Sequence, residues 1–376
     1  MLPTLDALAG KYALARPVNR PATLFLGRPF TKGARKKLVI YYEPNSISFT
    51  QVYPFLYYQD TLKARFGLEV RCYPVTKLLA GGAVRHDDAD IVLLQAWFTV
   101  SEDTLQDVFG RLVQANPQAS ISFMDTFAHS DIRMARHLEP NVDFYLKKSV
   151  FRDEQDFLRP FRGGTNLTEY YGDLYGIDAD PIDWNVPESM VEKLRLSPNF
   201  FTDPRFLHDF ATKDAPSHTD RPIDIQTRFG IRGTDWYQAM RQQALDRVRA
   251  IPGLKLSAPD TISWAKYMQE MRHSKLCLSP FGYGELCWRD VEAVATGSVL
   301  IKPDMSHLDT RPDIYEAGVT YLPIKWDFSD LEDVVQMALS DAGLRRDITQ
   351  NAYQRVAEYV RDKRFVDDMA FLFDKL

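Results

Sequence analysis

Short apolar runs alternate with longer amphipathic stretches along the chain, beginning at Leu38. The apolar runs have the length of buried strands, and the stretches between them have the spacing of helices. In the first half, the predicted strands cover 38–42, 68–73, 90–96, 120–125 and 142–146. A helix predicted from about 101 to 113 opens with Ser101 and Glu102, a pattern typical of helix N-termini. Strands that alternate with helices predict a parallel sheet with helices on both faces.

The pattern changes between about 160 and 222. This segment holds two adjacent glycines and seven prolines among polar residues, which predicts irregular structure and a linker. Because it also carries aromatic residues such as Trp184 and Phe200, part of it is expected to pack against a site or cover one.

The alternation of strands and helices resumes after this segment. The second set of predicted strands covers 223–227, 254–257, 275–278, 299–302 and 319–322. We therefore predict an α/β protein with two Rossmann-like domains that face a cleft. The predicted parts are a basic N-terminal extension (1–36), a first domain (37–215) and a second domain (216–357).

Composition narrows the class of protein. The chain has 376 residues, of which 45% are hydrophobic and 26% are charged, as in ordinary soluble globular proteins. Its net charge of -5 gives no reason to expect nucleic-acid binding. No apolar run is long enough to span a membrane, and the N-terminus lacks the features of a signal peptide. Three scattered cysteines favour neither disulfides nor a zinc site, so the cytoplasm is the expected compartment.

One stretch departs from this balance. From Lys11 to Lys37 the chain carries eight basic residues and no acidic one. A solvated extension explains this charge. The alternative is peripheral contact with anionic lipid or a charged polymer, which would place the protein at the inner face of the membrane.

The segment from Leu278 to Gly297 holds the most informative pattern. Gly282 and Gly284 lie between a predicted strand and a predicted helix, where free backbone N–H groups favour a phosphate. Arg289 in the first helical turn is disfavoured by the helix dipole unless an anion is near. Glu292 lies on the same face and suits ribose or sugar hydroxyls. The alternative is that Glu292 only complements the dipole or pairs with Arg289 on the surface.

A second interpretation of the same glycines must be weighed. Gly282, Gly284 and Cys287 come close to a dinucleotide-binding fingerprint, and Asp304 falls at the distance of the ribose-binding acid. The third glycine is missing, however, and too few strands follow to complete a dinucleotide-binding sheet. An NAD(P)-dependent oxidoreductase is therefore the less favoured alternative.

Three stretches together resemble a known family. They are His273–Pro280, Arg289–Ala293 and Thr296–Ile301. Their pattern is similar to the C-terminal domain of GT-B glycosyltransferases, in particular the group 1 branch with CgeB-like proteins and the exostosin-type domain. The resemblance covers about 90 residues, from 262 to roughly 350, and the loop of this chain is unusually aromatic.

The resemblance implies an activity and a donor site. It implies a hexosyl- or related transferase of polysaccharide biosynthesis, which moves a sugar from a nucleotide-diphosphate sugar to a glycan or lipid-linked acceptor. Residues 216–357 would bind the donor, and a final helix at about 358–376 would return to the first, acceptor-side domain. Arg289 would contact the diphosphate and Glu292 the ribose or sugar. The other donor-binding candidates in this loop are Ser279, Phe281, Gly282, Tyr283 and Gly284.

The loop from Arg228 to Thr234 adds two basic candidates. Arg228 and Arg232 follow the first strand of the second domain, where they would neutralise the leaving diphosphate, unless they are simply solvated. We expect no metal and no cofactor, because no Asp-x-Asp motif follows a predicted strand, and Asp178 to Asp180, which has the spacing, falls in the irregular segment.

Candidate acceptor-side residues follow strands of the first domain. Asp125, His129 and Asp131 are the predicted catalytic bases for an inverting transfer, although Asp131 could simply cap the next helix. Asn45, Ser46 and Trp97 are the predicted acceptor contacts, and Phe98 is expected in the core. A protein that kept this fold and binds a nucleotide sugar or glycan without turnover is the main alternative function.

Overall fold

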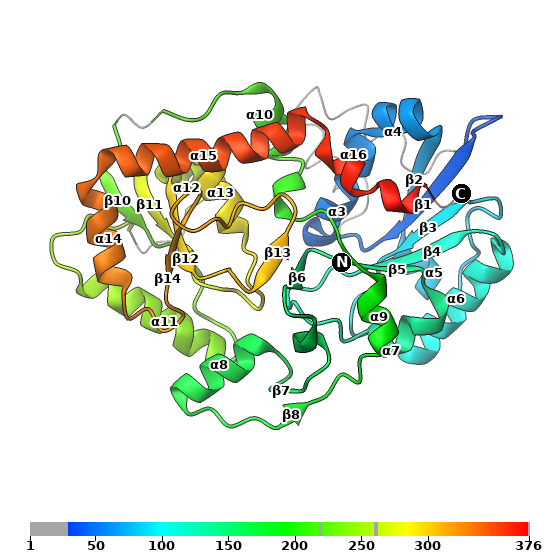
Figure 1. Cartoon of the computed structure of the whole chain (residues 1–376), viewed down its shortest axis with the longest axis horizontal. Helices are drawn as coiled ribbons and strands as arrows, with labels where there is room; N and C mark the ends of the chain where they lie inside the picture. Colours follow the sequence, from blue (N-terminus) through cyan, green and yellow to red (C-terminus); the bar gives the residue numbers. More distant parts are fainter. Residues whose placement is uncertain (1–28, 218–219, 259–261, 375–376) are drawn as a thin grey trace.

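The computed structural model describes residues 29–217, 220–258 and 262–374 (Figure 1). Most of the basic N-terminal stretch therefore lies outside the described residues. Its last two basic residues begin the first strand. There Lys36 donates to the Phe373 carbonyl oxygen, and Lys37 forms an ion pair with Asp88.

The first sheet has six parallel strands, in the order β2-β1-β3-β4-β5-β9. The cores of the first five are buried because helices cover both faces, whereas the edge strand β9 is only partly buried. The strands are β1 (Lys36–Tyr42), β2 (Leu68–Pro74), β3 (Ile91–Leu94), β4 (Ser120–Met124), β5 (Phe144–Lys147) and β9 (Leu194–Leu196). The helices are α3 (Ser46–Tyr57), α4 (Gln59–Phe66), α5 (Val75–Leu79), α6 (Glu102–Ala115), α7 (Ala135–Leu138) and α9 (Glu188–Lys193). Ser101 caps α6, as predicted, by accepting from the Thr104 N–H.

The second sheet has four parallel strands, in the order β10-β11-β12-β14. They are β10 (Ile223–Gln226), β11 (Ser274–Leu278), β12 (Val299–Pro303) and β14 (Leu322–Ile324). Around them lie α10 (Leu207–Thr212), α11 (Asp235–Ala250), α12 (Trp264–Arg272), α13 (Trp288–Thr296), α14 (Leu331–Ser340) and α15 (Ala342–Arg361). Helix α13 ends at Gly297 with a φ of 71°, the left-handed conformation expected there.

Two predicted strands of this half differ from the structure. The stretch 254–257 contributes only a single bridge between Leu256 and Ile225, and the last strand begins at Leu322 rather than at Val319. Val319 instead lies in a turn, where its N–H bonds to the Glu316 carbonyl oxygen.

The proline-rich segment is more ordered than its composition predicted. It forms α8 (Asn166–Tyr175), the antiparallel pair of strands β7 (Phe161–Arg162) and β8 (Pro181–Ile182) on either side of that helix in the sequence, and strand β9 of the first sheet. A capping box at Thr165 starts α8. The prolines fall at the starts of short elements or between them, so they bound those elements without preventing them.

Chain segments join the two halves at several places. Strand β6 (Ser149–Phe151) pairs antiparallel with β13 (Leu308–Thr310), midway between the sheets in Figure 1. The 3-10 turns η2 (Glu139–Asn141), η3 (Glu154–Phe157) and η4 (Phe200–Thr202) lie on the first-domain side of the chain. After α15, the chain crosses back to the first domain, where α16 (Arg364–Asp368) and η5 (Ala370–Leu372) lie beside the first sheet. There Phe365 packs on Phe55 with ring centres 4.9 Å apart.

Candidate functional site

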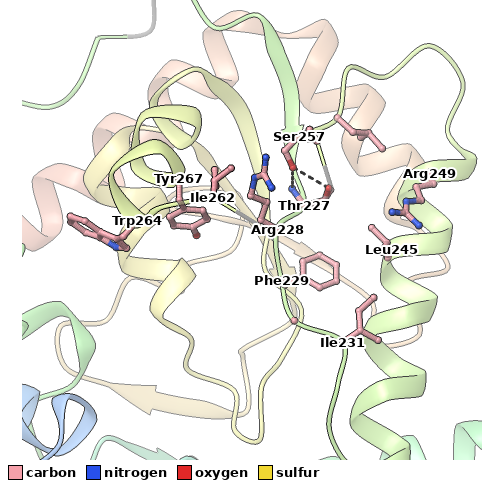
Figure 2. A pocket seen from close by; sticks show the side chains of 13 residues that line it. Thr227, Arg228, Phe229, Ile231, Leu245, Arg249, Ser257, Ile262, Trp264 and Tyr267 are labelled. Atoms are coloured by element: carbon pink, nitrogen blue, oxygen red, sulfur yellow. Dashed lines mark hydrogen bonds between the residues drawn. The ribbon is translucent and has the colours of Figure 1, made fainter. Parts of the chain in front are cut away.

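A cavity of about 940 Å³ opens at the carboxyl end of β10, within the usual size range of ligand pockets. Its walls come from the loop after β10, from α11 and from the start of α12 (Figure 2). Figure 2 shows Trp264 and Tyr267 on one side and Phe229, Leu245 and Arg249 on the other. Ser257 fixes the loop by accepting a hydrogen bond from the Thr227 N–H at 2.9 Å.

The two arginines predicted from the loop after β10 differ in surroundings. Arg228 lines the cavity, and Glu270 holds its Nε and Nη2 at 2.7 and 2.8 Å. Its charge is therefore already compensated. Arg232 is exposed. Their role in donor binding stays a prediction, and the structure offers stronger cationic candidates nearby.

Arg241 on α11 is the cation that the sequence analysis missed. Its side chain is only 5% exposed, donating from Nε to the Phe281 carbonyl oxygen at 2.7 Å and from Nη1 to that of Gly230 at 2.8 Å. It pairs with no carboxylate within the described part of the chain. Burial lowers the pKa of Arg241, and the positive charge of the nearby Arg289 lowers it further.

Arg289 is the second cation of this place. Its Nη1 lies 3.5 Å from Ser279 Oγ, its guanidinium lies 5.4 Å from the centre of the Phe229 ring, and its buried Nε has no hydrogen-bond partner. Neither guanidinium forms an ion pair with a carboxylate among the described residues, and each positive charge disfavours the other. Burial alone would lower the pKa of Arg289, but nearby ionisable groups, Tyr267 first and Glu292 among them, raise it, so Arg289 stays charged. A bound anion would relieve the repulsion between the two charges.

Gly282 and Gly284 serve the loop after β11 in different ways. A Cβ on Gly282 would lie 3.7 Å from both Arg241 Nη2 and Cys287 Sγ, so this glycine borders Arg241. A Cβ on Gly284 would lie 1.7 Å from the Ala128 carbonyl oxygen, so only glycine permits this contact with the first domain.

The aromatic residues of the loop are divided between core and surface. Phe281 is fully buried, with its ring centre 5.2 Å from that of Trp326, so its side chain belongs to the core. Tyr283 is 41% exposed, stacks on Tyr237 at 4.7 Å and accepts a hydrogen bond from the Thr234 N–H.

Glu292 is buried beside a residue of the cavity wall and does not face the solvent. It is 7% exposed, and Oε2 accepts a hydrogen bond of 2.8 Å from the hydroxyl of Tyr267, which lines the cavity. Its hydrogen-bond partner is thus Tyr267, and because Glu292 is buried it does not form a surface pair with Arg289, although its charge contributes to raising the pKa of Arg289.

The start of α13 already contains a carboxylate. Asp290 is fully buried, accepts from the Cys287 N–H at 3.0 Å and from Ser279 Oγ at 2.6 Å, and pairs with buried Lys302 at 3.1 Å. The N-terminus of α13 is therefore less of a bare cationic end than the sequence suggested. The case for an anion rests on the two arginines instead.

The predicted bases Asp125 and Asp131 both have strong partners. Asp125 is fully buried and accepts from Lys147 Nζ at 2.8 Å and the Tyr145 hydroxyl at 2.6 Å. Asp131 forms a bidentate pair with Arg133, at 2.8 and 2.7 Å. A carboxylate held this way is a poor proton acceptor, so catalytic roles for these two stay predictions that the geometry does not favour.

His129 lies at the contact between the two domains. Its ring is 6.4 Å from that of Tyr283, and its buried Nδ1 has no hydrogen-bond partner. Burial, followed by the charge of Arg133, lowers the pKa of His129 to about 4, so the imidazole is neutral near pH 7. Among the three predicted bases, it is the one with an uncommitted nitrogen.

Buried Lys148 gives the fold a measurable pH dependence. Burial, followed by the charge of Lys147, lowers the pKa of Lys148 to about 7. An unfolded lysine keeps its proton to about pH 10.4, so the unfolded state binds more protons between these values and stability rises with pH. Thermal unfolding measures the melting temperature of the wild type minus that of Lys148→Met, and this difference should be larger at pH 9.5 than at pH 7. The same difference for Lys325→Met, at an exposed residue, should not change with pH. A difference for Lys148→Met that is equal at the two pH values would contradict the prediction.

Glu285 is the other residue that the sequence analysis missed. This fully buried carboxylate accepts from Ser130 Oγ at 2.9 Å and Asn166 Nδ2 at 2.8 Å, and it lies 3.4 Å from His307 Nε2. Burial alone would raise the pKa of Glu285, but its hydrogen bond with His307 and the other donors lower it to about 2. An ionised carboxylate thus ties both domains to the loop after β11.

The predicted acceptor contacts lie at the carboxyl edge of the first sheet. Asn45 caps α3 by accepting from the Ser48 N–H at 2.9 Å, and Ser46 begins that helix. Trp97 is half-buried and packs edge-on against Phe127. Phe98 was expected in the core, but it is 43% exposed, because it caps the Phe127 ring from outside.

Within the residues that the structure describes, no group of three or more histidine, cysteine, aspartate or glutamate side chains is arranged to hold a metal ion. In the same residues, no helix is both long and apolar enough to cross a membrane.

Comparison with known proteins identifies the fold. No protein-family model and no curated protein sequence matches the chain. Among solved structures, it is similar to an alpha-glucosyltransferase in complex with UDP and a 13-mer DNA containing a central A:G mismatch, at 10% identity and a TM-score of 0.50, covering 88% of this chain and 98% of that one. A putative UDP-N-acetylglucosamine 2-epimerase from Listeria monocytogenes gives 12% identity and a TM-score of 0.46, covering 91% and 97%.

The chain has the GT-B fold, with two Rossmann-like domains and parallel sheets, as the sequence predicted. Membership of the CgeB-like or exostosin-like branch stays a prediction. The expectation that the chain avoids nucleic acid gains no support, since one similar structure was solved with DNA.

Proposed function

We propose that this chain is a glycosyltransferase that uses a nucleotide-diphosphate sugar and binds its diphosphate with Arg241 and Arg289. The observation that carries the proposal is this arginine pair, which forms no ion pair with a carboxylate among the described residues and whose Arg241 borders Gly282. Two fixed positive charges can stabilise a leaving diphosphate in place of a metal ion, so we propose a metal-independent reaction.

The rest of the donor fits the surrounding groups. The cavity of about 940 Å³ beside the pair would take the nucleoside, between the Trp264 side and the Phe229 side. Glu292, held by Tyr267, would accept hydrogen bonds from ribose or sugar hydroxyls. UDP in the similar glucosyltransferase structure is consistent with a ligand of this kind.

The transfer itself follows from these positions. The acceptor hydroxyl oxygen forms a bond to the anomeric carbon, the bond from that carbon to the diphosphate oxygen breaks, and its electron pair stays on the diphosphate. The acceptor proton passes to a base, for which neutral His129 at the domain contact is the best placed of the predicted residues. The acceptor we propose is a glycan or lipid-linked sugar.

Nucleotide titration tests the proposal. Isothermal titration with UDP, GDP, ADP and TDP should show binding of at least one, and Glu292→Ala should weaken it about 10- to 100-fold, since hydrogen bonds to charged groups contribute about 1.5–3 kcal/mol. Glu292→Gln keeps the shape of the side chain and checks folding, while Glu332→Ala on exposed α14 is the matched control.

Two results separate the alternatives. Binding of a nucleotide sugar without hydrolysis or transfer to any glycan extract would favour a non-catalytic binding protein. Absence of binding by all four nucleotides would refute the proposal.

A further inference from the structure

A second cavity, of about 410 Å³, lies at the carboxyl ends of β12 and β14, on the opposite side of the second sheet from β10. The strand order β10-β11-β12-β14 separates it from the larger cavity, because its residues Asp304 and Trp326 follow β12 and β14. Its remaining walls come from α8 and from the segment after β6, so both halves of the chain contribute. Its size, at the small end for ligand pockets, suits a single small ring system.

Charge in this cavity is opposite to that at the arginine pair. Four carboxylates line it, against one lining guanidinium, that of Arg159, and one of the four, Asp173, pairs with Arg162 outside the lining. Arg159 pairs with Asp156 and Glu169, both at 2.9 Å. An excess of carboxylates repels phosphate and favours a neutral or amino-bearing ligand with many hydroxyl groups, because carboxylate oxygens accept hydrogen bonds.

An aromatic corner supplies the apolar side of the cavity. Tyr170 is 37% exposed, and its ring centre lies 5.0 Å from that of half-buried Trp326. The indole of Trp326 is fixed by donating to the Asp304 carbonyl oxygen at 2.9 Å, and His307 packs edge-on against it at 5.0 Å. Rigid aromatic faces beside carboxylates match a sugar ring, which has apolar C–H faces and a polar hydroxyl rim.

Two buried side chains stand between this cavity and the arginine pair. Phe281 is fully buried against Trp326, and fully buried Glu285 contacts Asn166 and His307 of the cavity wall. The diphosphate-linked sugar would therefore lie on the other side of these groups. His307 links the cavity to Glu285, and hence to the loop after β11.

We infer that this second cavity binds a neutral or amino-bearing sugar residue of the acceptor glycan, away from the sugar being transferred. The assignment to the acceptor rests on the proposed glycosyltransferase function, whereas sugar binding by the cavity does not.

Sugar titration of the full chain tests the inference. Protein labelled with 5-fluorotryptophan is titrated with glucose, galactose, N-acetylglucosamine, glucosamine and their β-linked disaccharides, and the Trp326 fluorine signal is assigned with Trp326→Phe. At least one sugar should shift that signal, and Tyr170→Ala should weaken its binding at least tenfold, with UDP affinity unchanged. Met337→Ala, at an exposed apolar residue of α14, should leave the sugar affinity unchanged.

Three results would overturn the inference. The first is that no sugar of the panel shifts the Trp326 signal, and the second is that Tyr170→Ala binds sugar as tightly as wild type. The third is that Tyr170→Ala weakens UDP-glucose or UDP-N-acetylglucosamine more than UDP, which would assign the cavity to the donor. Failure of UDP to bind, with sugar binding intact, would instead refute only the proposed transferase function.

Discussion

Replacing Arg241 with methionine should weaken nucleoside diphosphate binding on the order of 100-fold. Methionine keeps the apolar stem over Tyr237 but removes a charge that has no carboxylate partner in the described structure. The same loss should follow from Arg289→Met, and transfer or donor hydrolysis should fall at least as far, because the leaving diphosphate carries more charge in the transition state. Isothermal titration and initial rates measure the two effects.

The control for this experiment lies on the same helix. Arg247→Met removes an exposed arginine of α11, and its affinity should match that of wild type. Circular dichroism establishes that Arg241→Met is folded, since the lost hydrogen bonds to Phe281 and Gly230 also fix the loops. If both arginine variants fold and bind nucleotide as wild type does, the anion site is not here.

Lys302→Met should lower the free energy of unfolding by about 3–5 kcal/mol, because it leaves the carboxylate of Asp290 buried without its cation. Both side chains are fully buried, and the carboxylate also accepts from the Tyr315 hydroxyl at 2.7 Å and from Ser279. Urea unfolding followed by tryptophan fluorescence measures the change.

A second substitution separates charge from packing. Adding Asp290→Asn to Lys302→Met removes the stranded charge while keeping most hydrogen-bonding atoms, and should recover part of the lost stability. Exposed Lys325→Met should unfold at the wild-type urea concentration. A single variant Lys302→Met as stable as wild type would show that the ion pair does not hold α13 to β12.

The strands and helix ends that the sequence predicted correctly are those that depend on residues close together in the chain. Buried runs such as Leu38–Tyr42 are apolar whatever their neighbours, and Gly297 ends its helix through its own backbone freedom. Strand β9 escaped prediction because its three residues are too few to show a period, and the long-range pairing with β5 creates it.

The candidate site was less predictable because it depends on contacts between distant residues. Asp125 does follow a strand, as expected, but Lys147 from the next strand neutralises it, and the sequence does not show that pairing. Arg241 did leave a signal, since it lies four residues from both Tyr237 and Leu245 beside the apolar row of α11. Glu285 left none, because its partners come from three separate segments.

The packing of the C-terminal segment against the first sheet has a consequence for synthesis. Phe55 and Tyr58 bury their rings against Phe365, and Phe66 packs on Phe373, near the end of the chain. On the ribosome, where a chain grows at about 5–20 residues per second, the first domain therefore stays incomplete until residues 365–373 have been added, after the whole of the second sheet. A chain truncated before Phe365 would leave the rings of Phe55 and Tyr58 without their packing partner.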